Sequence, residues 1–219
     1  MKWTNAIVTL SCLAGVLGSE QVVFGADEAA MSSFGIDGSG LVDYTVGGHS
    51  LLALHKSLVE IESISSNEWN VATYLRSYLE TLGLTVELHR VEDNRSNVYA
   101  YVGQKRNTRL LLTSHIDTVP PYLPYDVQGS KIYGRGSCDA KGSVATQIIS
   151  FLDLLKSGSV SEGDVALLYV VGEEVNGVGM DEVSKSLNAT WESAIFGEPT
   201  ELKLGVGHKG NYMFDLTAT

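Results

Sequence analysis

Four short segments of the sequence carry side chains that could bind a divalent metal ion or transfer a proton. Three segments follow apolar runs, and the fourth is the glycine-rich stretch GRGSCDAKG at 134–142. The candidate residues are His115, Asp117, Asp139, Glu173, Glu174 and Glu198. Carboxylates that lie close together repel one another and take up protons, and a divalent metal ion removes that cost. One imidazole with several carboxylates suits zinc, with cobalt or manganese as possible substitutes.

Asp139 lies where a tight glycine turn precedes a predicted amphipathic helix, whose apolar stripe includes Val144, Ile148 and Leu152. A single aspartate before a helix is commonly an N-cap. The other candidate ligands favour a second interpretation, in which the Asp139 carboxylate bridges two metal ions. In the pair Glu173 and Glu174, one residue could bind metal while its neighbour accepts a proton from water. An isolated pair of this kind would be a solvated turn.

The elements that position these residues are short strands. Apolar runs end near His115, Glu174 and Glu198, and they alternate with helical patterns, which indicates an α/β layered sheet. Because binding sites in such sheets lie at the carboxyl ends of the strands, the three side chains should converge. His115 and Asp117 are two residues apart, so in an extended chain they face the same side and Asp117 could orient the imidazole ring.

The composition narrows the possible partners. The chain has 219 residues, of which 44% are hydrophobic, so we expect one main domain with a packed core. The formal net charge is −11, which argues against nucleic acid and against anionic membranes as partners.

The N-terminus predicts export from the cell. Residues 1–18 have the charge and apolar run of a signal peptide, with cleavage expected between 18 and 25. Removal of this segment leaves Cys138 as the single cysteine, so we expect no intrachain disulfide. Asn94 and Asn188 begin sequons and are candidate glycosylation sites in a secreted, extracellular protein. Residues 26–48 have no clear periodicity, and we expect a flexible leader there.

Four motifs in order, SHIDTV, GRGSCDAKG, GEE and GEPT, resemble the dinuclear zinc aminoacylase and carboxypeptidase family, and in particular its secreted fungal-type carboxypeptidases. The resemblance implies a three-layer α/β/α sandwich around a mostly parallel sheet, with 49–204 as the N-terminal part of the catalytic domain. It implies that His115 and Glu198 bind one zinc ion, that Glu174 binds the other, and that Asp139 bridges them. Asp117 would orient His115, and Glu173 would be the general base.

The same resemblance implies hydrolysis of an amide bond next to a free carboxylate, in a peptide or an N-acyl amino acid. The family also has a further histidine ligand and a lid or dimerisation domain, of which 205–219 resembles the start. We therefore expect a truncated chain with little or no activity, and a homodimer only with the missing lid. An amino-acid N-deacylase and an inactive metal-binding remnant remain alternatives. A cysteine hydrolase using Cys138 is disfavoured, because Asp139 beside the thiol opposes the thiolate.

Overall fold

The computed structural model describes residues 32–36, 40–201, 203 and 205. The predicted signal peptide, its cleavage site and the predicted lid segment after 205 lie outside the described residues. Among the helices of the described residues, none is long and apolar enough to span a membrane.

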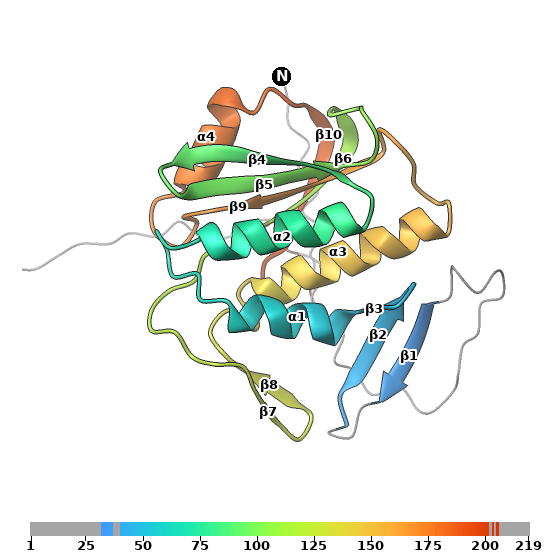
Figure 1. Cartoon of the computed structure of the whole chain (residues 1–219), viewed down its shortest axis with the longest axis vertical. Coiled ribbons are helices and arrows are strands. Elements are labelled where there is room, and N and C mark those ends of the chain that lie inside the picture. The colour runs from blue at the N-terminus through green and yellow to red at the C-terminus, as the bar shows by residue number, and fades with distance from the viewer. Residues whose placement is uncertain (1–31, 37–39, 202, 204, 206–219) are drawn as a thin grey trace, which may run out of the picture.

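The centre of the fold is a mixed sheet of five strands (Figure 1). Its spatial order is β10 (Trp191–Phe196), β6 (Thr108–His115), β9 (Val165–Val170), β5 (Arg95–Tyr101) and β4 (Thr85–Glu92). Strands β10, β6 and β9 pair in parallel, and β5 is antiparallel to both of its neighbours. Four of the five strands therefore run in one direction, as the predicted mostly parallel sheet requires. The apolar run of β9 is buried along its whole length, as expected for a strand covered on both faces.

Helices cover both faces of this sheet, which confirms the three-layer architecture (Figure 1). Helices α1 (Leu51–Glu60), α2 (Trp69–Thr81) and α3 (Lys141–Lys156) pack on one face around the larger hydrophobic core. Helix α4 (Val178–Ser186) covers the other face, where Val183 and Leu187 bury their side chains against β5, β6 and β9. The sequence pattern predicts the first three helices, but it did not reveal α4.

Two small antiparallel sheets complete the described structure. One consists of β1 (Ser32–Ile36), β2 (Val42–Val46) and β3 (His49–Ser50), and the other of β7 (Asp126–Gln128) and β8 (Lys131–Tyr133). The first sheet differs from the flexible leader expected over 26–48. It is attached to the core by fully buried Val46 and by a hydrogen bond of 2.8 Å from the Tyr44 hydroxyl to Asp153. Its β1 side chains Phe34 and Ile36 are exposed, so this strand adds no buried apolar face to the core.

Candidate metal centre

The sheet order brings three sequence segments to one end of neighbouring strands. His115 is the last residue of β6, Glu173 and Glu174 follow β9, and Glu198 follows β10. These three strands are adjacent and parallel, so their carboxyl ends meet at the same edge of the sheet. The three strand ends therefore lie side by side, as the predicted convergence of His115, Glu174 and Glu198 requires.

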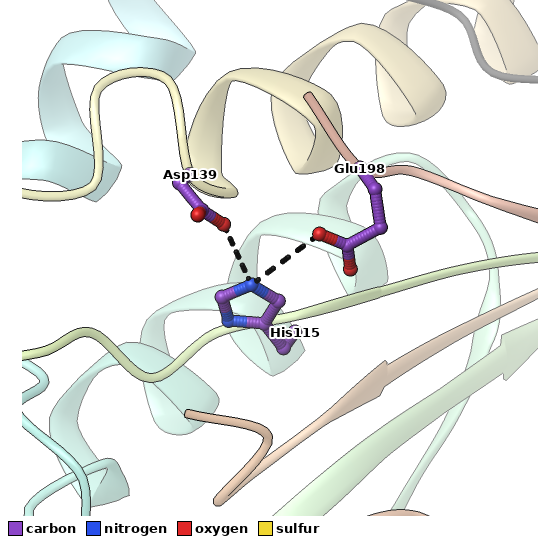
Figure 2. Close-up of side chains that lie close together, drawn as sticks. All are labelled: His115, Asp139 and Glu198. Atoms are coloured by element: carbon purple, nitrogen blue, oxygen red, sulfur yellow. Dashed lines mark hydrogen bonds and ion pairs between the residues drawn. The ribbon is translucent and has the colours of Figure 1, made fainter. Parts of the chain in front are cut away.

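His115, Asp139 and Glu198 form the core of the site (Figure 2). Each offers one potential metal-binding atom, and these atoms lie within 4.8 Å of one another. The Nε2 atom of His115 is 3.0 Å from Asp139 Oδ1 and 4.0 Å from Glu198 Oε2. Figure 2 shows both carboxylates pointing at this nitrogen from different segments of the chain. One nitrogen and two carboxylate oxygens at this spacing are a donor set that fits zinc.

Asp139 faces the imidazole and does not cap the helix that follows it. Helix α3 begins at Lys141, and its N-cap residue is Ala140, with no side-chain hydrogen bond to the helix. The turn before Asp139 depends on Gly136, which has φ +84°. A Cβ atom there would lie 2.8 Å from Thr118 Cγ2, so the turn needs glycine for both its conformation and its space.

The side chain of Asp117 joins two parts of the site. The Nδ1 atom of His115 is 2.9 Å from the backbone oxygen of Asp117 and 3.5 Å from its carboxylate, so the closer contact on the ring is the carbonyl. The fully buried carboxylate accepts hydrogen bonds from the backbone N–H groups of Glu173 and Glu174, at 3.0 and 3.2 Å. It therefore holds the glutamate turn as well as lying beside the histidine.

Ser65 is a further contributor that the sequence did not reveal. Its hydroxyl donates a hydrogen bond of 2.7 Å to Asp117 Oδ2 from a position 52 residues earlier in the chain. A serine in a polar loop carries no pattern that would distinguish it from its neighbours. Its contact with Asp117 becomes visible only in the folded structure.

The two glutamates occupy different positions in the site. The Glu173 side chain is 51% exposed, and its Oε2 lies 3.9 Å from His115 Nε2, so the carboxylate can reach both water and the site. Glu174 lies outside the group of three close ligand atoms formed by His115, Asp139 and Glu198. The roles predicted for this pair, base for Glu173 and second-ion ligand for Glu174, stay predictions.

The charges of the site favour a cation. Burial and the neighbouring Asp139 carboxylate raise the pKa of Glu174, and burial raises the pKa of Glu198 to about 7 although His115 opposes this. Burial lowers the pKa of His115, but the carboxylates of Asp117 and Asp139 outweigh it and raise this pKa to about 11. Without a metal ion, His115 holds a proton at neutral pH and Glu198 holds one below about pH 7, and a divalent cation would displace both.

The two sequons lie on the surface. Asn94 is in the exposed β4–β5 turn with φ +57°, and Asn188 is exposed between α4 and β10 with φ +51°. Their exposure is compatible with glycans, and their occupancy stays a prediction.

Comparisons with known proteins relate this chain to a family of peptidases. The profile of peptidase family M20/M25/M40 matches residues 111–213. A Schizosaccharomyces pombe protein named as a peptidase M20 domain-containing protein is 64% identical over 174 residues, which cover 78% of this chain and 44% of that protein. A probable carboxypeptidase of Aspergillus clavatus is 41% identical over 214 residues, covering 89% of this chain and 51% of that protein.

A solved structure agrees with these relatives. The crystal structure of a tripeptidase from Staphylococcus aureus has a TM-score of 0.53 and 26% identity, and the match covers 63% of this chain and 40% of that chain. The chain spans about half the length of the curated relatives it matches. The profile match includes every candidate residue of the metal centre, from His115 to Glu198. Residues 111–213, which carry the candidate metal centre, therefore belong to a domain of peptidase family M20/M25/M40.

Proposed function

We propose that this protein is a zinc-dependent carboxypeptidase that hydrolyses the amide bond next to a free carboxylate. The observation that carries the proposal is the convergence of His115 Nε2 with the carboxylates of Asp139 and Glu198, within 4.8 Å of one another. The relatives named probable carboxypeptidases support the substrate class. His115, Asp139 and Glu198 would hold one ion, and Asp139 with Glu174 would hold a second.

The chain's own residues supply the proton transfers. A bound zinc ion would act as a Lewis acid and would lower the pKa of water towards about 7. The Glu173 carboxylate would accept the proton of the attacking water and return it to the leaving amine, and its exposure to solvent and its position 3.9 Å from His115 Nε2 support this role. The Asp117 carboxylate fixes the backbone of Glu173, so the base is held close to His115. This division needs both glutamates of the pair, one as base and one as ligand.

Hydrolysis of an N-acylated dipeptide by the purified chain with added zinc tests the proposal against the alternative of an inactive metal-binding remnant, which would show the little or no activity expected from the sequence. The proposal requires release of the C-terminal amino acid, loss of this activity in Glu173→Gln, and no cleavage of the same dipeptide with an amidated C-terminus. A rate no higher than that of Glu173→Gln would contradict the proposed activity. Faster cleavage of N-acetyl amino acids than of dipeptides would favour the alternative, an amino-acid N-deacylase of the same family.

We also propose that the protein is secreted and glycosylated. The apolar N-terminal run supports export, and the exposed positions of Asn94 and Asn188 support modification. Expression in a secreting eukaryotic host should give protein in the medium whose mass falls on treatment with an endoglycosidase. The double variant Asn94→Gln, Asn188→Gln should show no such fall. Protein retained in the cytoplasm with an intact N-terminus would contradict secretion.

A further inference from the structure

His55 contacts the segment that carries Asp139, although its sequence pattern is that of an ordinary helical residue. It lies on α1 with 7% of its surface exposed, and its Nε2 is 2.8 Å from the backbone oxygen of Ser137. A carbonyl oxygen can only accept a hydrogen bond, so Nε2 carries the proton and donates it. The ring also packs edge-on against Tyr125, with ring centroids 5.9 Å apart. The donor is therefore fixed in direction by both contacts.

A second contact links α1 to the same segment. The Lys141 side chain is almost completely buried, and its Nζ donates a hydrogen bond of 2.7 Å to the backbone oxygen of Ile61, the C-cap residue of α1. Ser137 and Lys141 stand two residues before and two residues after Asp139. The backbone that presents the Asp139 carboxylate is thus attached to α1 on both sides.

This double attachment matters because Asp139 has few restraints of its own. Its side chain is 53% exposed, and the one hydrogen bond described for its carboxylate is the contact with His115 Nε2, the atom that would itself bind the metal. It makes no capping bond to α3. The position of the carboxylate therefore depends on the backbone of 137–141 and on what holds that backbone.

We propose that His55 is a positioning residue for the metal centre, which acts through its hydrogen bond to Ser137 to hold the Asp139 carboxylate opposite His115. The role rests on the proposed metal site. Outer partners that orient a ligand typically contribute about 10- to 100-fold to metal affinity. His55 does not itself touch the metal-binding atoms, so its loss should weaken binding without removing a ligand.

The test measures Co²⁺ affinity of the full chain by competition with a chromogenic chelator, together with the visible absorption of bound Co²⁺. His55→Leu removes the donor and should weaken Co²⁺ binding about 10- to 100-fold. His55→Gln keeps an N–H donor and should recover most of that loss. His89→Leu is the matched control, because His89 lies on β4 and contacts Ser186 of α4 instead. Thermal unfolding of each variant identifies any that fails to fold.

A double-mutant cycle with Asp139→Asn separates positioning from a general loss of stability. If His55 acts through Asp139, then His55→Leu should cause little further loss of Co²⁺ affinity in the Asp139→Asn background. Equal and additive losses in both backgrounds would overturn the proposal, as would an unchanged affinity in a folded His55→Leu variant or a similar loss in His89→Leu. Failure of the unsubstituted chain to bind Co²⁺ would instead overturn the metal site, and the positioning role with it.

Discussion

Replacement of Asp117 by asparagine should destabilise the fold through the turn that carries the two glutamates. The change keeps the size of the side chain but turns one acceptor oxygen into an NH₂ donor. One oxygen accepts from Glu173 N, and the other accepts from Glu174 N and Ser65 Oγ. In the first orientation the NH₂ group faces Glu173 N, and in the second it faces Glu174 N, although the Ser65 hydroxyl can then accept from it. In either orientation at least one backbone N–H of the glutamate turn loses its acceptor. At about 1–3 kcal/mol for such a group, the free energy of unfolding should fall by at least that amount.

Urea unfolding followed by circular dichroism measures this loss as a shift of the midpoint at constant slope. Ser65→Ala is the control, because it removes one donor and leaves the Asp117 oxygen paired with Glu174 N. Its cost should be about 0.5–1.5 kcal/mol, the usual contribution of a single hydrogen bond. A loss for Asp117→Asn that is no larger than the loss for Ser65→Ala would show that the Asp117 carboxylate does not hold the glutamate turn.

Two further predictions concern protons and backbone space. Because the pKa of Glu198 is raised to about 7 and that of His115 to about 11, both groups hold protons below pH 7. Co²⁺ must displace these protons, so its affinity should fall as the pH is lowered from 8 to 5.5. An affinity that is independent of pH in a chelator competition would contradict this prediction. Gly172→Ala should lower the free energy of unfolding, measured in urea, by more than the cost of placing alanine in a left-handed conformation, which is about 1–2 kcal/mol. The additional loss is expected because the new Cβ would lie 2.8 Å from Val178 Cγ1. Gly158→Ala is the matched control, with a similar φ of +71° and open space around the Cβ, and an equal loss would contradict the steric argument.

The sequence predicts the main sheet and the convergence of the strand ends, because both depend on local patterns. Uninterrupted apolar runs mark β6 and β9, and strands that alternate with helices indicate where their ends meet. The spatial order β10-β6-β9 differs from the chain order, but any arrangement that makes these strands parallel neighbours would bring His115 and Glu198 together. The approach of His115 and Glu198 was therefore predictable without knowledge of the strand order.

The remaining features depend on contacts between distant segments. Nothing near His55 in sequence indicates that its ring meets the carbonyl of Ser137, 82 residues away. The contact of the Asp117 carboxylate with the glutamate turn is also between distant residues, because it joins the segments that follow β6 and β9. Helix α4 has nine residues, and Gly179 and Val183 are its buried positions, too few to form a recognisable apolar stripe.

Metal binding by the purified chain with one ligand removed tests the proposed site most directly. Metal-free protein is titrated with Co²⁺ under chelator competition, and His115→Ala is compared with His89→Ala, a histidine outside the site. We expect binding by the unsubstituted chain, no significant change for His89→Ala, and a loss of more than about 100-fold for His115→Ala, beyond what an outer partner contributes. Equal affinity of the two variants would contradict the claim that His115, Asp139 and Glu198 together form a metal centre.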